Sequence, residues 1–223
     1  MITALLISCS KRTSPLLTDP SAGTTSISTI CTQVENYNFP DNRAFVSILN
    51  QGSTAITDFS VGNFSVVEDG RPTIVTKVKK IDNAIDVLST AIAFDRSGSM
   101  GDGPGSSLEA AQIAAKSYIN AVAPTDYIEI IAYDNEVKVY SEFTNNKSYL
   151  TSVIDGIVSG GATASYDAVV KAAEDLGARG GRKVVILLTD GDDNSSSNSE
   201  TACINKVNSK GVACFTIGVG SGV

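Results

Sequence analysis

Histidine is absent from this 223-residue chain, and that absence excludes more functions than any other feature of its composition. Without histidine the chain cannot form a Ser-His-Asp or Cys-His catalytic set, a His-ligated zinc site, or the usual general base near neutral pH. The chain has four cysteines, Cys9, Cys31, Cys203 and Cys214, and none of them forms a CxxC pair, which argues against a zinc ribbon or a thioredoxin-type motif. No apolar run approaches the roughly 20 residues of a membrane-spanning helix.

Basic residues are also few relative to acidic ones. The chain has 17 Lys and Arg against 24 Asp and Glu, a formal net charge of -7. This balance argues against sequence-independent nucleic-acid binding, which needs a basic surface, and it is compatible with a cation-binding face. With 42% hydrophobic and 18% charged residues, the composition is that of a globular chain long enough for one full domain and a small one.

The first 36 residues carry targeting and linker patterns. Leu6-Ile7-Ser8-Cys9 resembles a bacterial lipobox, so residues 1–9 are interpreted as a lipoprotein signal that ends with a lipidated Cys9. The alternative is an ordinary thiol near the chain end. Residues 10–36 are rich in Ser and Thr without a clear period, and we predict a flexible linker there.

Residues 37–82 have the texture of a small antiparallel β unit. Asp69-Gly70 is a hairpin signal between two of its three β-type runs, which cover residues 44–49, 63–68 and 73–78. Because so small a sheet is marginal in water on its own, we expect it to pack on the following domain.

Residues 83–223 alternate between strand and helix patterns. We predict strands over 87–94, 127–133, 137–143, 183–188 and 212–219, and helices over 106–121, 147–157, 166–176 and 200–209. The order predicts a doubly wound, mostly parallel α/β sheet with one antiparallel edge strand. Ligands of such sheets bind at the carboxyl ends of the strands.

Side chains that carry oxygen atoms are found in three of the loops that connect the predicted strands and helices. Asp95, Ser97 and Ser99 follow one predicted strand, Thr163 follows a glycine pair, and Asp190 follows another strand. Carboxylates and hydroxyls without histidine or cysteine suit a hard divalent cation better than a catalytic nucleophile.

These loops resemble the metal-ion-dependent adhesion site of a von Willebrand factor type A (vWA) domain. The motifs are DRSGSM at 95–100, GGAT at 160–163 followed by YDA at 166–168, and TDG at 189–191. They occur in the family's order at the matching elements, and the resemblance covers roughly residues 86–219. The family usually continues with another strand and a C-terminal helix, so residues 83–223 are expected to lack both.

The resemblance also implies a role for each residue. Ser97 and Ser99 would bind Mg²⁺ directly, Thr163 would join them in the ligand-engaged state, and Asp95 and Asp190 would act mostly through water. One coordination position stays open for a Glu or Asp carboxylate of a partner protein. Mn²⁺ and Ca²⁺ are the alternative ions.

Two aspartates and two cysteines outside the predicted metal-binding set also carry expectations. Asp192 and Asp193 are expected to be solvated charges at the rim of the site. Cys203 and Cys214 either form a disulfide or are two small buried thiols.

The leading functional hypothesis is a Mg²⁺-dependent protein-binding or adhesion module, exported to a bacterial cell envelope. It is not an enzyme, binds no nucleic acid, and touches the membrane only through a lipid on Cys9. One alternative is a cytoplasmic scaffold that acts with an ATPase partner. A Mg²⁺-assisted hydrolase is the other, and it has less support because the chain has no GxxxxGK[ST] loop and no histidine.

Overall fold

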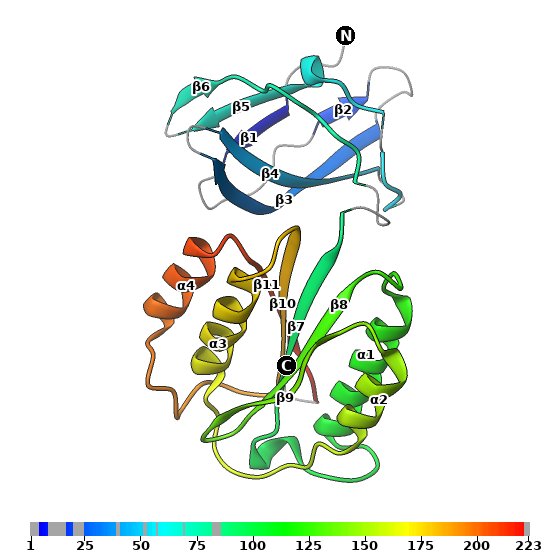
Figure 1. Cartoon of the computed structure of the whole chain (residues 1–223), viewed down its shortest axis with the longest axis vertical. Helices are drawn as coiled ribbons and strands as arrows, with labels where there is room; N and C mark the ends of the chain where they lie inside the picture. Colours follow the sequence, from blue (N-terminus) through cyan, green and yellow to red (C-terminus); the bar gives the residue numbers. More distant parts are fainter. Residues whose placement is uncertain are drawn as a thin grey trace. The chain divides into compact units, whose positions relative to one another are not determined.

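The chain divides into two units, residues 1–81 and residues 82–223, in a computed structural model (Figure 1). The structure describes residues 5–8, 17–19, 25–38, 41–50, 53–56, 58–68, 70–81 and 86–220. Cys9, the residue of interest in the lipobox resemblance, lies outside them. Among the described residues, no helix has the length and apolar character needed to cross a membrane.

The described residues of the first unit form two three-stranded sheets, with strand orders β1-β5-β6 and β2-β3-β4. Their strands are β1 (Leu5–Ser8), β2 (Leu17–Asp19), β3 (Thr25–Asn38), β4 (Asp41–Leu49), β5 (Phe64–Glu68) and β6 (Arg71–Thr73). A small apolar cluster centres on Ile48, and the rings of Phe59 and Phe64 meet edge to face in it, 5.7 Å apart.

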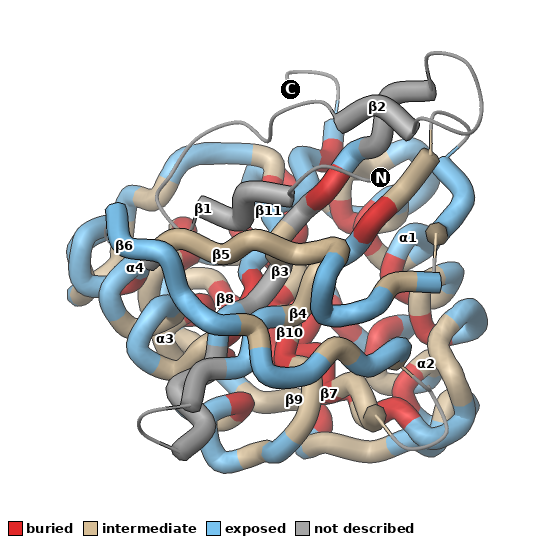
Figure 2. The backbone as a smooth tube through the Cα atoms, turned by 90° about the horizontal axis from the view of Figure 1, so that it is seen from above, coloured by how far each residue is buried: buried red, intermediate tan, exposed pale blue. Residues whose placement is uncertain are grey.

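Several elements of this unit differ from the expectations. β2 lies inside the predicted linker, and β1 pairs parallel with β5 although the unit was expected to be antiparallel. β3 lies where the sequence suggests a flexible linker, and it pairs along most of its length with β4, whose apolar run is the stronger strand signal. The strand predicted over 73–78 overlaps the observed one at a single residue, since β6 covers only Arg71–Thr73. β6 is exposed along its length (Figure 2). β6 begins directly after Gly70, whose φ of 79° makes the tight turn from β5.

The second unit is the predicted doubly wound α/β sheet, and this prediction of fold class is confirmed. Its five strands have the order β11-β10-β7-β8-β9, and only the β8–β9 pair is antiparallel. The elements are β7 (Leu88–Asp95), α1 (Ser107–Ala121), β8 (Tyr127–Tyr133), β9 (Val137–Thr144), α2 (Lys147–Asp155), α3 (Ser165–Gly177), β10 (Arg182–Thr189), α4 (Glu200–Ser209) and β11 (Ala213–Gly218).

Helices cover both faces of this sheet, α1 and α2 on one face and α3 and α4 on the other (Figure 1). Successive side chains of a strand point to opposite faces, so Ile92 and Phe94 pack toward α1 and α2 while Ala91 and Ala93 pack toward α3. β7 is buried on both faces, and its central residues, Ala91 to Phe94, form a continuous apolar run as such a strand usually does.

The strands β7 and β10 are neighbours and run parallel, so their carboxyl ends meet at one edge of the sheet. Phe94 lies opposite Leu188, and the residues that follow them, Asp95 and Thr189, come together. The residues that carry the metal-site resemblance emerge at this edge.

Candidate metal site

Asp95 ends β7 and is fully buried, with an exposed fraction of 0%. Both of its carboxylate oxygens are engaged. Oδ1 accepts a 2.8 Å hydrogen bond from the backbone N–H of Ser97, and Oδ2 accepts a 2.7 Å bond from the hydroxyl of Thr189. Asp95 therefore fixes the loop after β7 and joins it to the end of β10.

Three oxygen side chains form a chain of hydrogen bonds beside Asp95. The hydroxyl of Ser99 donates to Oδ1 of Asp190 over 2.9 Å, and the Oγ atoms of Ser97 and Ser99 are 3.0 Å apart. Ser99 has one hydroxyl hydrogen, which it gives to Asp190, so Ser97 is the donor in the serine pair. Ser97 is 2% exposed, whereas Ser99 faces solvent.

Thr163 joins the site through its backbone. Its N–H donates to Oδ1 of Asn194 at 2.9 Å, and its carbonyl accepts from the N–H groups of Asn194 and Ser195, both at 3.0 Å. The Thr163 side chain is 5% exposed. The segment after Asp190 therefore sets where Thr163 lies, although its residues carry no motif of the family.

Backbone hydrogen bonds also tie the first loop to the glycine pair. The N–H of Gly98 donates to the carbonyl of Gly161 at 3.0 Å, and the N–H of Gly160 donates to the carbonyl of Arg96 at 2.7 Å. Each of the three loops that carry the five predicted residues is thus hydrogen-bonded to the other two.

The glycine at position 161 is needed for a close approach to the β8–β9 turn. Its φ is +85°, and a Cβ there would lie 2.5 Å from Oδ1 of Asn135 and 2.8 Å from Cβ of Asp134. Oδ1 of Asn135 also accepts from the N–H of Ala162 at 2.9 Å. The small residue makes room for the neighbouring turn.

Two charged side chains that are not among the five predicted metal-site residues hold these loops. The guanidinium of Arg96 pairs with Asp134 and donates to the carbonyl of Val158 at 3.2 Å. Asp102 accepts two 2.8 Å bonds from Ser159, one from its N–H and one from its hydroxyl, and these bonds lower the pKa of Asp102. The sequence signal for Arg96 is its place inside DRSGSM, but its partner Asp134 is 38 residues away and carries no local signal.

The phenol of Tyr133 is buried beside Asp95. Burial, and then the neighbouring Asp95 carboxylate, raise the pKa of Tyr133, so its hydroxyl stays neutral at physiological pH. A neutral phenol is a poor proton acceptor.

The donor set and its spacing fit a small hard cation. Adjacent ligands of an octahedral Mg²⁺ at about 2.1 Å lie about 3.0 Å from each other. The separations of 3.0 Å between the serine hydroxyls and 2.9 Å between Ser99 and Asp190 match this spacing. Within the part of the chain that the structure describes, no three His, Cys, Asp or Glu side chains group as metal ligands.

Asp193 was expected to be a solvated rim charge, and that expectation is wrong. Oδ2 of Asp193 accepts from the hydroxyl of Ser165 at 2.9 Å, the N–H of Tyr166 at 3.0 Å and the hydroxyl of Ser196 at 2.6 Å. It therefore caps the start of α3 from a different loop, a contact that no local pattern reveals. Asp192, in contrast, is exposed.

Asp167, in the first turn of α3, accepts hydrogen bonds from the segment that contains Asp193. Its carboxylate accepts from the N–H groups of Ser197 and Asn198, each at 2.8 Å, and from the Asn198 side chain. The start of α3 and residues 193–198 thus hold each other in place.

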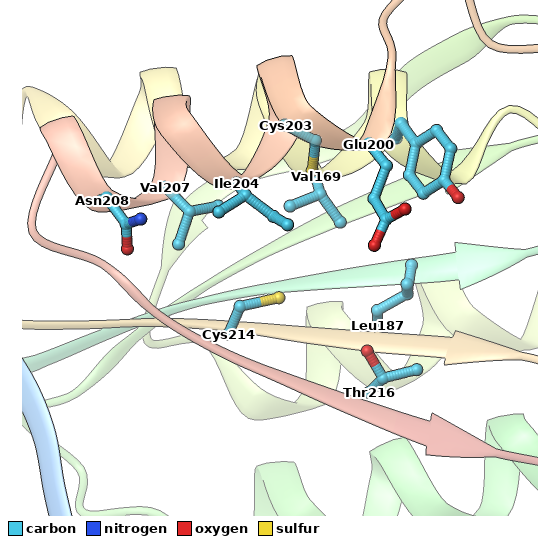
Figure 3. Close-up of a pocket in the computed structure, with 10 residues that line it drawn as sticks. Val169, Leu187, Glu200, Cys203, Ile204, Val207, Asn208, Cys214 and Thr216 are labelled. Atoms are coloured by element: carbon cyan, nitrogen blue, oxygen red, sulfur yellow. The ribbon is translucent and has the colours of Figure 1, made fainter. Parts of the chain in front are cut away.

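A pocket of about 200 Å³ lies between the helices α3 and α4 and the strands β10 and β11, and none of the five predicted metal-site residues lines it (Figure 3). Cys203 and Cys214 both line it as free thiols, with Leu187 and Thr216 nearby. The backbone of Cys214 belongs to an exposed edge strand, but its thiol points into the pocket, where burial raises its pKa to about 11. Cys203 and Cys214 are not joined in a disulfide in this structure.

Comparison with known proteins identifies the part of the chain that carries the site. Residues 90–192 match the family model described as von Willebrand factor type A domain. This segment is a vWA domain. No curated protein matches the chain's sequence at a significant level.

Solved structures share the fold of the vWA domain at low sequence identity. BatB from Bacteroides thetaiotaomicron matches with a TM-score of 0.52 and 20% identity, over 59% of this chain and 66% of BatB. An aerotolerance-related membrane protein from Bacteroides fragilis NCTC 9343 matches with 0.53 and 21%, over 60% of this chain and 68% of that one. Proximal thread matrix protein 1 from the mussel byssus matches with 0.54 and 22%, over 61% of this chain and 36% of that one. The chain thus spans about two thirds or less of the length of these proteins.

Proposed function

We propose that the vWA domain is a protein-binding module that holds Mg²⁺ on Asp95, Ser97, Ser99, Thr163 and Asp190. In this proposal Ser97 and Ser99 bind the ion directly, while Asp95 and Asp190 act mostly through water. The observation that carries the proposal is that the Oγ atoms of Ser97 and Ser99, the two proposed direct ligands, lie 3.0 Å apart, which is the spacing of adjacent metal ligands, while Ser99 is held by a 2.9 Å hydrogen bond to Oδ1 of Asp190.

The burial of Asp95 supports its indirect role. Both of its oxygens already accept hydrogen bonds inside the protein, so it contributes charge and orientation to the ion. With few direct anionic ligands the ion stays electrophilic, which favours an additional carboxylate ligand. We propose that a Glu or Asp of a partner protein supplies it, and that the domain catalyses no reaction of its own.

The metal site is tested by isothermal titration of the full chain with MgCl₂ after treatment with EDTA. We expect saturable binding that Ser99→Ala and Asp190→Asn each weaken by about 10-fold or more, since each removes a ligand or its anchor. Ser117→Ala, at an exposed serine on α1, is the matched control and should bind like the wild type. Equal binding by the wild type and Ser99→Ala would rule out this site.

The carboxylate partner is tested separately on an array of peptides centred on Glu or Asp, with Gln and Asn versions beside them. Capture should require both Mg²⁺ and the carboxylate. If the metal binds but capture is the same on Gln and Asn peptides, the metal site stands and the carboxylate proposal fails.

We further propose that the chain works in a bacterial cell envelope, anchored through a lipid on Cys9. The fold likeness to an aerotolerance-related membrane protein supports the compartment. Intact-mass detection of a diacylglycerol on Cys9 in the native producer would support the anchor. An unmodified chain beginning at Met1 in the cytosol would instead support the scaffold with an ATPase partner.

A further inference from the structure

Glu129 is a carboxylic acid in the middle of the central sheet. It lies on β8 opposite Ala91 of β7, and its exposed fraction is 0%. The residues two and four positions further along the strand, Ile131 and Tyr133, pack in the core beneath α3. Because strand side chains alternate, Glu129 points to that same face.

The carboxyl group has no hydrogen-bond partner among the described residues. Both Oε1 and Oε2 are buried and unpaired. A carboxylate anion in such a place would carry a large desolvation cost, whereas a neutral carboxylic acid would not.

The charged groups around Glu129 increase this preference. Asp175 on α3 and Glu142 on β9 place negative charge near it, and Lys171 on α3 is the opposing positive charge. The amine of Lys171 is already paired with Asp175 at 2.6 Å, which limits what it offers to a second carboxylate. Burial is the largest cause and Asp175 the second, and together they raise the pKa of Glu129 to about 8.

We propose that Glu129 is an internal proton-binding site of the vWA domain, and that its proton couples the packing of α3 on the sheet to pH. When the proton leaves, Glu129 and Asp175 become two negative charges across the interface between β8 and α3. The helix that would be pushed away begins at Ser165, two residues after Thr163.

The direction of the pH effect on stability follows from proton uptake on folding. In the unfolded chain the Glu129 carboxyl loses its proton near its ordinary pKa of 4.5, whereas in the folded domain it keeps it up to about 8. Between these values the folded state binds one more proton than the unfolded state, so stability falls as the pH rises. The folding equilibrium constant should drop by about 10-fold per pH unit in this window and level off above it.

Urea unfolding of the full chain and of Glu129→Gln between pH 5.5 and 9, without added metal, isolates this contribution. The glutamine has the same shape but does not titrate, so the contributions of groups that do not interact with Glu129 cancel in the comparison. We expect the ratio of the wild-type to the Glu129→Gln folding constant to fall by at least 50-fold from pH 5.5 to 8, then to stay constant. A ratio that does not change with pH overturns the proposal.

Glu142→Gln is the control, because Glu142 is an exposed carboxylate near the same site. It should retain most of the wild-type pH dependence. If Glu129→Gln does not fold, a ¹³C NMR titration of the wild-type side-chain carboxyls replaces it. A resonance with a midpoint near 8 that moves down in Asp175→Asn supports the proposal, and the absence of any Glu midpoint above 6 overturns it.

The link to α3 is read by hydrogen exchange. After correction for the intrinsic rate, the amides of α3 should exchange faster at pH 8.5 than at pH 6.5 in the wild type, with a smaller change in Glu129→Gln. If the exchange rates of the α3 amides change equally in both proteins, the Glu129 proton does not affect α3 and the coupling is refuted. All three measurements are made without Mg²⁺, so their outcome is independent of the metal proposal.

Discussion

The hydroxyl of Thr189 donates a 2.7 Å hydrogen bond to Oδ2 of Asp95, joining the last residues of two neighbouring strands. Thr189 is 9% exposed and Asp95 is fully buried, so this bond is shielded from water. Oδ1 of Asp95 is held in turn by the N–H of Ser97. The plane of the carboxylate is therefore fixed from both sides before any ligand arrives.

Replacing Thr189 by Val should weaken Mg²⁺ binding by about 10- to 100-fold, the usual effect of removing a group that orients a metal site. Valine keeps the branched shape that suits the strand but leaves Oδ2 of Asp95 without its donor. Stability should fall by about 1–3 kcal/mol for the same reason. Titration calorimetry and urea unfolding measure the two effects.

Thr189→Ser is the matched control, since it keeps the hydroxyl. It should bind Mg²⁺ more tightly than Thr189→Val. If both variants bind alike, the hydroxyl does not orient the site.

Gly161→Ala should lower the free energy of unfolding by about 1–3 kcal/mol, the usual cost of a strained backbone position. The added Cβ would meet Asn135 and Asp134 at distances no real contact allows, at a φ that disfavours alanine. Gly180→Ala is the control, because its Cβ meets nothing within 4 Å and its φ is not in the left-handed region. Comparable losses in both variants would show that the close approach to the β8–β9 turn does not matter.

Much of this architecture was predictable, because each element of the second unit carries a local signal. β8, for example, is an apolar run whose observed bounds, Tyr127–Tyr133, equal the predicted ones. Ser106 precedes α1 and accepts a hydrogen bond from the N–H of Glu109, as expected of an N-terminal cap. A cap of this kind depends on residues that are neighbours in the chain, so the sequence displays it.

The contacts that shape the site were not predictable, since they join residues far apart in the chain. Asn194 holds the backbone of Thr163 across 31 positions, and Arg96 meets Asp134 across 38. Glu129 illustrates the same limit within a strand. Its position in an apolar run suggests burial, but only the packed structure shows that both of its oxygens are buried and that Asp175 of α3 lies beside it.

Asp193→Asn should destabilise the domain by about 1 kcal/mol at pH 7, the typical contribution of a helix cap. Burial raises the pKa of Asp193, but hydrogen bonds from Ser196, Tyr166 and Ser165 outweigh it and lower the pKa overall. A carboxylate with a lowered pKa stabilises the fold above the ordinary value of 3.8, and this contribution is lost as the pH falls through the lowered value.

The difference in unfolding free energy between the wild type and Asp193→Asn should therefore shrink as the pH falls from 5 to about 2.5. Thermal or urea unfolding at several pH values measures it. Asp192→Asn, one residue away at an exposed side chain, should show a smaller difference at every pH. If the difference in unfolding free energy depends on pH in the same way for both variants, Asp193 contributes no more to stability than a solvated charge.

The thiol of Cys214 should react slowly with iodoacetamide at pH 7.5, at well below the rate of an unhindered thiol. The thiolate is the reacting form, and burial raises the pKa of Cys214 to about 11, so the thiolate is scarce near neutral pH. Peptide mass spectrometry after timed alkylation separates Cys214 from Cys203, whose pKa burial also raises. The Cys214 rate should increase about 10-fold per pH unit up to pH 10 if the domain stays folded, and the protein in urea should react at the normal rate. A Cys203–Cys214 disulfide would instead give no alkylation of either residue until a reductant is added, and that result would contradict the two free thiols.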